Sequence, residues 1–90
     1  MKTTKVKYEI MTEDMNRDRV TEIVSRFFPS FSIVPQVGIW KDVKENSISI
    51  VIIGYQSDEV CVHEMALEIK TLNRQQAILV AKSYVECILI

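Results

Sequence analysis

The chain has 90 residues, a formal net charge of −1, and 48% hydrophobic and 26% charged residues. This length suits one domain, spanning 1–90, with a modest core, and is too short for two. The near-neutral charge and the lack of a basic block argue against nucleic-acid binding, which depends on neutralising phosphates. We therefore expect one ordinary globular domain rather than a disordered or nucleic-acid-binding chain.

Hydropathy and cysteine content predict the compartment. The longest apolar run, Ile50 to Ile53, is far shorter than the ~20 residues that a membrane-spanning helix needs. The first residues do not form a signal-peptide pattern. Cys61 and Cys87 are too few for a disulfide framework, so we expect two buried, reduced thiols. These features predict a cytoplasmic protein without membrane contact.

The first third of the chain predicts a strand followed by a helix. Lys5 to Ile10 alternates polar and apolar residues, which is typical of a half-buried strand. Residues Thr12 to Asn16 offer possible N-caps, and Pro29 ends the helix that follows. The apolar residues at helical spacing are Val20, Ile23, Val24, Phe27 and Phe28.

The middle of the chain predicts a hairpin. Phe31 to Trp40 reads as a strand, and Pro35 places it at a sheet edge because proline cannot donate to a ladder. Gly38 is expected to mark a β-bulge, and Lys41 to Asn46 is expected to form the turn. Ser47 to Tyr55 is apolar on both faces, which indicates a central strand whose two faces are both covered.

The last third predicts a second helix and a fourth strand. Ser57 and Asp58 are expected to cap the helix, and Asn73 to form its left-handed C-cap. Ala77 to Ile90 reads as the last strand. The buried stripe of the helix is Val62, Met65, Ala66, Ile69 and Leu72. The order β-α-β-β-α-β predicts an α+β, ferredoxin-like sandwich, with an antiparallel sheet of strand order 4-1-3-2 and both helices on one face.

Catalytic and metal-binding sets are sparse. Gly38 and Gly54 are isolated, so there is no glycine-rich phosphate loop. Cys61 and His63 lie two residues apart on a helix and point in different directions, so we expect neither a metal nor a cofactor. Glu59 lies four residues before His63, and this pair could transfer protons in a small enzyme. The simpler interpretation is a solvated helix flank, and we expect no enzyme.

Two known uses of this topology fit poorly. RNA-binding domains carry aromatic residues on the open sheet face, but Ser47 to Tyr55 has one aromatic and no Arg or Lys. Acylphosphatase-like chemistry would need an arginine after the first strand and a partner asparagine. Arg17 or Arg19 with Asn46 or Asn73 would have to serve, without a glycine-rich cradle.

Two helices cover only one face of a four-stranded sheet, so apolar residues on the other face need another cover. Such a patch would exceed what a soluble monomer usually exposes. We therefore predict a homodimer or higher oligomer, sheet face against sheet face. The alternative is a monomer kept soluble by flanking charges: Lys7, Glu9, Lys82 and Glu86. The expected interface residues are Val51, Ile53, Tyr55, Ile88 and Ile90, joined by Val34 and Trp40.

One stretch carries a family resemblance. Gly38-Ile39-Trp40, followed by Glu45-Asn46-Ser47-Ile48-Ser49-Ile50, resembles small uncharacterised phage and bacterial proteins with a Gly-x-Trp/Tyr turn, then Glu-x-Ser/Thr and an apolar strand. The segment from Asn73 to Val80 is similar to their Gln-x-Ser/Ala-Val-Leu ending. The resemblance implies a ferredoxin-like fold and no established activity. It places any family site at the hairpin that holds Trp40 and Glu45.

The leading hypothesis is a non-catalytic, homo-oligomeric binding protein. By analogy with other phage proteins of this size, it would be an accessory or anti-defence inhibitor. Its partners would be a second copy and either a host protein or a small nucleotide. A nucleotide-sequestering protein would stack a base on an aromatic ring and bind the phosphate through Arg17, Arg19 or Lys41. The candidate ligand-binding residues are Trp40, Lys41, Glu45 and Tyr55.

Overall fold

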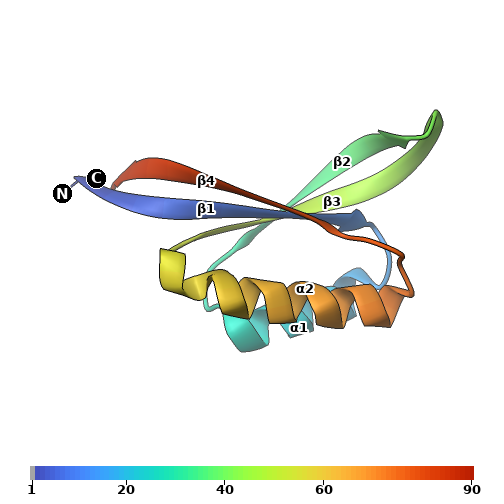
Figure 1. The fold of residues 1–90 in the computed structure, drawn as a ribbon, viewed down its shortest axis with the longest axis horizontal. Helices are drawn as coiled ribbons and strands as arrows, with labels where there is room; N and C mark the ends of the chain where they lie inside the picture. Colours follow the sequence, from blue (N-terminus) through green and yellow to red (C-terminus); the bar gives the residue numbers. More distant parts are fainter. Residues whose placement is uncertain (1) are drawn as a thin grey trace.

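The computed structural model describes residues 2–90 and contains a sheet packed on two helices (Figure 1). The antiparallel sheet has the order β2-β3-β1-β4, and both helices lie on one face. This confirms the predicted fold class and strand order. The elements are β1 (Lys2–Glu13), α1 (Arg17–Phe27), β2 (Ser32–Trp40), β3 (Val43–Gly54), η1 (Gln56–Asp58), α2 (Glu59–Asn73) and β4 (Leu79–Ile88). In residues 2–90, no helix is long and apolar enough to cross a bilayer.

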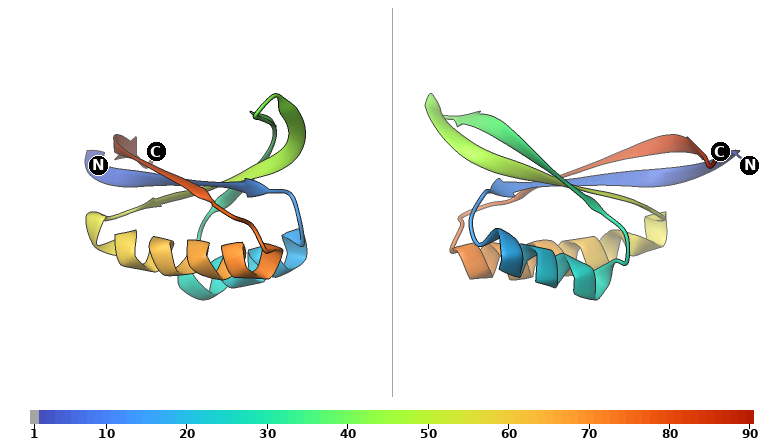
Figure 2. Two further views of the ribbon diagram at one scale, coloured as in Figure 1. Left: turned by 45° about the vertical axis from the view of Figure 1, so that its right-hand side comes forward. Right: turned by 180° about the vertical axis from the view of Figure 1, so that it is seen from behind.

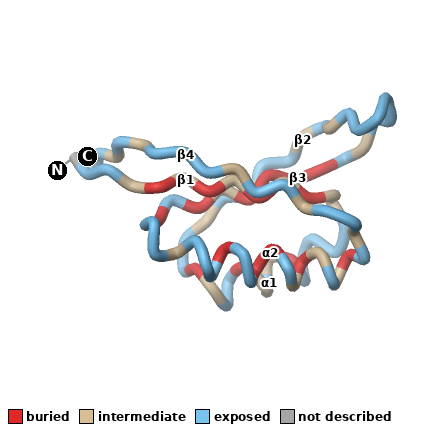
Figure 3. Tube along the Cα trace, viewed as in Figure 1, coloured by how far each residue is buried: buried red, intermediate tan, exposed pale blue. Residues whose placement is uncertain are grey.

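The core lies between the helices and the two central strands, where Figure 3 shows most of the buried positions. Tyr8 pairs with Ile52 and Ile10 with Ile50, so their side chains share the helix-facing side. These four side chains are at most 1% exposed. Each such buried isoleucine contributes about 1.5–3 kcal/mol through burial of apolar surface. The helices close the core with Val20, Val24, Val62, Met65, Ala66 and Ile69.

Strand β2 lies at an edge of the sheet, as Pro35 predicts. Its pairing with β3 is continuous from Ser32↔Val51 to Trp40↔Val43. The predicted bulge at Gly38 is therefore wrong: Gly38 pairs directly with Glu45, within an uninterrupted ladder. Glycine is tolerated there simply because the position lies on an exposed hairpin.

The turn between β2 and β3 is much shorter than predicted. It consists of Lys41 and Asp42 alone, and Val43–Asn46, expected in the turn, belong to β3. The sequence was misleading because strands that extend beyond a core can carry polar residues on both faces. Figure 2 shows this hairpin rising away from the helices at the end of the sheet opposite the chain termini.

The predicted caps are replaced by other contacts. Thr12 lies inside β1 and is buried, and the Asn16 side chain binds that of Asn73 instead of capping α1. The Asp58 carboxylate accepts a hydrogen bond from the backbone N–H of Tyr55 at 2.8 Å, so it closes the turn before α2. The left-handed residue after α2 is Arg74, while Asn73 is the last helical residue. Pro29 does follow the end of α1, as expected.

The register of β4 corrects one prediction about the open face. Tyr84 pairs with Val6, which faces the helices, so even-numbered residues of β4 lie on the helix side. Ile88 has this parity and does not project from the open face beside Val51 and Ile53. Ile90 lies beyond the end of β4.

The short turn generates a stability prediction. Lys41 and Asp42 have φ values of 48° and 65°. This is the left-handed region, in which residues other than glycine are strained. Asp42→Gly should therefore raise the free energy of unfolding by about 0.5–1 kcal/mol, measured by urea denaturation. The matched control is Asp18→Gly in the first turn of α1, which should lower it by about 0.5–1 kcal/mol through lower helix propensity and loss of an acid near the helix N-terminus. A loss of stability in Asp42→Gly would contradict the turn geometry.

Candidate functional site

A groove of about 650 Å³ lies between the projecting hairpin, the end of β1 and the connection from α2 to β4. We call it the hairpin groove. Trp40 and Glu45 line it from the hairpin, and Met11 and Glu13 from β1. Arg74, Gln75 and Gln76 line it from the connection after α2.

Side-chain hydrogen bonds hold the α2–β4 connection against β1 and α1. The Thr12 hydroxyl donates to the side-chain oxygen of Gln75. Asn16 donates to the Asn73 side chain at 2.9 Å, and the Gln75 N–H donates to the Lys70 carbonyl at 3.1 Å. The wall of the groove opposite the hairpin is therefore held by several contacts, while the hairpin itself is largely exposed.

The charges of the groove are unequal. Glu13 and Glu45 contribute two carboxylates, and Arg74 contributes one guanidinium. Arg74 directly follows α2, so the C-terminal end of that helix, with its partial negative charge, also borders the groove. The site is thus suited to a cation or a neutral polar group more than to a phosphate.

The structure unites only part of the predicted ligand site. Trp40 and Glu45 both line the hairpin groove, whereas Lys41 occupies the turn and is not among its lining residues. Tyr55 directly follows β3 at the opposite end of that strand, where the Lys5 ammonium lies 5.1 Å from its ring centroid.

Sequence reasoning missed Glu13, Arg74 and Gln75 as groove residues. Arg74 and Gln75 lie within the Asn73 to Val80 segment that carries the resemblance, but only the packing of α2 under the sheet brings this segment and Glu13 to the hairpin.

The open face of the sheet carries a band of exposed apolar side chains. Ile53 is 45% and Val34 48% exposed, and both share this face with Val51. Ser49 lies between Val34 and Met11 in the register. It is 4% exposed, and its hydroxyl is the buried side-chain oxygen within residues 2–90 that lacks a hydrogen-bond partner. A buried hydroxyl without a hydrogen-bond partner lowers the free energy of unfolding by about 1–3 kcal/mol.

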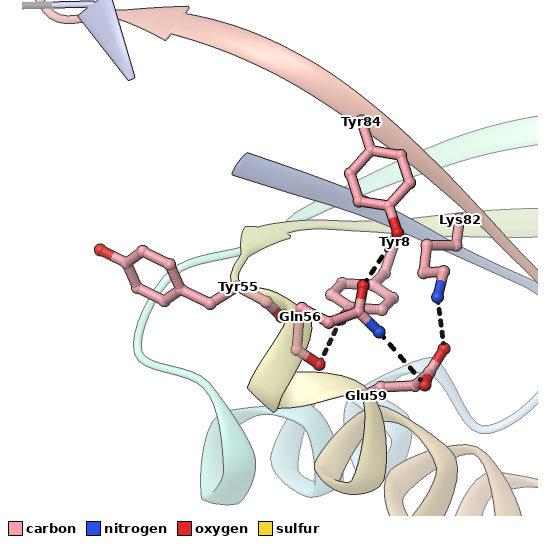
Figure 4. Close-up of polar contacts among 6 residues, drawn as sticks. All are labelled: Tyr8, Tyr55, Gln56, Glu59, Lys82 and Tyr84. Atoms are coloured by element: carbon pink, nitrogen blue, oxygen red, sulfur yellow. Dashed lines mark hydrogen bonds and ion pairs between the residues drawn. The ribbon is translucent and has the colours of Figure 1, made fainter. Parts of the chain in front are cut away.

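A second polar cluster joins β4 to the start of α2 (Figure 4). The Lys82 ammonium donates to Glu59 at 2.8 Å, and the Tyr84 hydroxyl donates to the Gln56 side chain at 3.1 Å. The buried Tyr8 hydroxyl donates to the Tyr55 carbonyl at 2.7 Å. These groups satisfy one another, which indicates a structural role.

Other candidates are not assembled into a site. Glu59 binds Lys82 and Gln56, while His63 is exposed, so the proposed Glu59/His63 proton-transfer pair has no support from these contacts. Arg17 binds Asp14, and Arg19 lines a surface hollow between the helices, away from Trp40.

The cysteines and other possible metal ligands are also dispersed. Cys61 is exposed rather than buried as predicted, and Cys87 is partly buried. Within the described residues, no three side chains of His, Cys, Asp or Glu are placed to hold a metal ion.

The Tyr8 environment predicts a dependence of stability on pH. Burial, and then the nearby Glu59 carboxylate, raise the pKa of Tyr8 above its usual 10.0. Above about pH 10 the unfolded chain loses this proton first, so the stability that neutral Tyr8 contributes falls as pH rises. Tyr8→Phe should lower the free energy of unfolding by about 1–2 kcal/mol at pH 7 and flatten its decline at alkaline pH.

The control for this measurement is Tyr55→Phe, which removes an exposed hydroxyl and keeps the backbone carbonyl that accepts from Tyr8. It should leave the alkaline decline as in the wild type, since Tyr8 and its neighbours are unchanged. Equal alkaline slopes in the two variants would show that Tyr8 does not contribute.

Structural comparisons place the chain among small α+β proteins. CPII, a nitrogen regulatory PII-like protein from Thiomonas intermedia K12 bound to ADP, AMP and bicarbonate, matches with a TM-score of 0.71 and 15% identity, over 100% of this chain and 99% of that chain. A phage SAM lyase in the apo state matches with a TM-score of 0.71 and 22% identity, over 90% and 81%. A DUF3240 family protein from Shewanella baltica OS155 matches with a TM-score of 0.69 and 8% identity, over 89% and 88%.

At these identities the likeness shows the fold. No protein-family model and no curated protein matches the sequence. The fold is thus shared with regulatory proteins that have been seen with bound nucleotides and with a phage enzyme.

Proposed function

We propose that this protein binds an adenosine-containing small molecule in the hairpin groove and works as a homo-oligomer. The observation that carries the proposal is the position of Trp40, an aromatic ring that is 66% exposed, at a groove lined by carboxylate, amide and apolar side chains. A flat, exposed ring beside hydrogen-bonding groups suits a ligand with a planar heterocycle.

The class of ligand follows from chemistry shared by the structural neighbours. The PII-like protein holds ADP and AMP, and the phage enzyme is named for S-adenosylmethionine. Adenosine is the part that these molecules have in common. Trp40 would stack on the adenine, as aromatic residues do on bases, and Gln36, Gln75 and Gln76 line the groove with amides that can bind its edge.

The charge of the groove favours one member of this class. Phosphates are commonly bound at helix N-termini or by glycine-rich loops, whereas this groove adjoins the C-terminal end of α2. Glu13 and Glu45 outnumber Arg74. A sulfonium cation such as S-adenosylmethionine therefore suits the groove better than AMP or ADP does.

Isothermal titration calorimetry with S-adenosylmethionine, AMP and ADP tests the proposal. We expect S-adenosylmethionine to bind most tightly, and Trp40→Ala to weaken binding by about tenfold or more through loss of stacking. Glu45→Gln should weaken binding of S-adenosylmethionine but not of AMP, because only the former is a cation.

The matched control is Tyr55→Ala, an exposed aromatic residue at the other end of β3. It should leave affinity within about twofold of the wild type. Loss of binding in Tyr55→Ala with normal binding in Trp40→Ala would place the site at the wrong end of the sheet for our proposal. Absence of heat with all three ligands would refute it.

Catalysis in the same groove is a second candidate function. Glu13 and Glu45 are carboxylates beside the proposed adenosyl site. A carboxylate can accept a proton from carbon while the neighbouring C–S bond of the sulfonium breaks and a neutral thioether leaves. In the titration this function would show itself as a progressive loss of S-adenosylmethionine, followed by chromatography. Recovery of intact S-adenosylmethionine would exclude catalysis and support binding alone.

Self-association through the open face rests on the exposed apolar band. A second copy covering Val34, Val51 and Ile53 would remove apolar surface from water. Sequestration of a small ligand by such an assembly is in keeping with the anti-defence role predicted by analogy with other phage proteins of this size. A host protein partner is a separate prediction of that analogy.

Size-exclusion chromatography with light scattering tests this interface. The wild type should elute as a dimer or larger oligomer at tens of micromolar, and Ile53→Arg should shift it toward the monomer by placing a charge in the apolar band. The control is Val60→Arg on α2, where Val60 is 66% exposed. This variant should leave the measured mass unchanged. A monomeric wild type would refute the open-face interface.

A further inference from the structure

We propose a second self-association surface, which adjoins the groove at Leu79: the free edge of β4 pairs antiparallel with β4 of a second copy. The two-fold axis passes through Tyr84, so the two four-stranded sheets continue into one another. The argument rests on the contrast between the two edges of the sheet, on the side chains of β4 and on its charge pattern.

The two edges of the sheet differ in their protection. The outer strands are β2 and β4, and each leaves one row of backbone N–H and C=O groups without a strand neighbour in the described chain. Strand β2 carries Pro35, which has no N–H to donate, and Gly38. Strand β4 runs through ten residues without proline or glycine and pairs with β1 without interruption. The β4 edge therefore remains competent to accept another strand.

The side chains of β4 also lack cover on both faces. On the helix side, Tyr84 is 69% and Ile88 60% exposed. On the open side, Leu79 is 61% exposed, and beyond the strand Leu89 is 92% exposed. A neighbouring strand at the edge would bury parts of all four, because side chains of paired strands contact across each face.

When two copies of β4 pair about Tyr84, apolar residues lie opposite apolar residues and opposite charges lie opposite one another. Val80 lies opposite Ile88 of the second copy, and Leu79 lies opposite Leu89. Lys82 lies opposite Glu86, and this pair occurs twice, once on either side of the axis. Moving the axis to Ser83 sets Val80 against Glu86, and moving it to Val85 sets Lys82 against Ile88. Only the axis at Tyr84 joins opposite charges and apolar pairs together, which favours this register. The Lys82 ammonium has three donors, so it can keep its bond to Glu59.

Cysteine cross-linking tests the register. One variant is Tyr84→Cys in a chain whose Cys61 and Cys87 are replaced by serine, which places two thiols at the axis. The other is Ala81→Cys with Cys61→Ser, which places the new thiol opposite Cys87 of the second copy. Neighbouring pairs in an antiparallel ladder alternate between close and wide spacing, so one of the two positions has the closer spacing, which suits a disulfide.

We expect at least one of these variants to form a disulfide-linked dimer under mild oxidation about tenfold faster than the control, because pairing raises the effective concentration of the thiols. The control is Val60→Cys, an exposed position on α2 outside both proposed interfaces, also in the chain with both native cysteines replaced by serine. Circular dichroism confirms that each variant is folded. If neither folded variant cross-links faster than Val60→Cys, the β4 pairing is refuted.

Charge reversal provides a second, independent readout. Lys82→Glu and Glu86→Lys should each weaken the dimer about fivefold by opposing like charges, and the double variant should restore it. Sedimentation measurements of these variants in an Ile53→Arg background remove the contribution of the open face. A double variant no tighter than the single variants would overturn the register. Calorimetry with S-adenosylmethionine on the same proteins should be unchanged, which separates this proposal from the ligand site.

Discussion

The isoleucines of β3 are the constraint on which the structure depends. Ile48, Ile50 and Ile52 are each at most 1% exposed, and they lie on a central strand that pairs with both β2 and β1. Because the side chains of a strand alternate, burying this row under the helices forces Ser49, Val51 and Ile53 onto the opposite face. The core and the open face are therefore two consequences of one strand, and a shift of one residue in its register would exchange them.

The hairpin groove exists because the sheet is longer than the helices that cover it. The hairpin formed by β2 and β3 extends past the core, and the connection after α2 turns back toward it (Figure 1). The Thr12–Gln75 hydrogen bond ties this connection to β1. One wall is thus held by the core, while the other, with Trp40 and Glu45, is a projecting ribbon with few buried side chains. Such an arrangement allows the ribbon to adjust to a ligand without disturbing the folded core.

Ligand binding and assembly use neighbouring parts of the sheet in our proposals. The groove lies at the hairpin, the apolar band crosses the open face, and the unprotected edge belongs to β4. The polar cluster of Tyr8, Gln56, Glu59, Lys82 and Tyr84 fixes β4 to the start of α2, so it presents that edge in a defined position (Figure 4). Leu79 lines the groove and also belongs to β4, while Ile53, Lys82 and Glu86 lie outside the groove lining, so substitutions at these three positions test assembly without altering the groove.

Local patterns were sufficient for most of the fold. Alternation in β1 and β3, helical spacing before Pro29, and Pro35 in an edge strand predicted the elements, their order and the buried side of the sheet. Local patterns fail where polar residues fit two structures: residues 43–46 have the composition of a turn although they extend a strand, and Thr12, Asp58 and Asn73 are typical of caps although they make other contacts.

The sequence by itself determined which faces are apolar, because burial of apolar side chains follows the periodicity of each element. Only the tertiary structure decided which face of β4 carries Ile88 and which residues meet Trp40. The strands β1 and β4 are joined by no short turn, so their register depends on long-range pairing, and no local pattern specifies it. Likewise, Glu13, Arg74 and Gln75 reach the hairpin only because α2 packs beneath the sheet and ends beside β1.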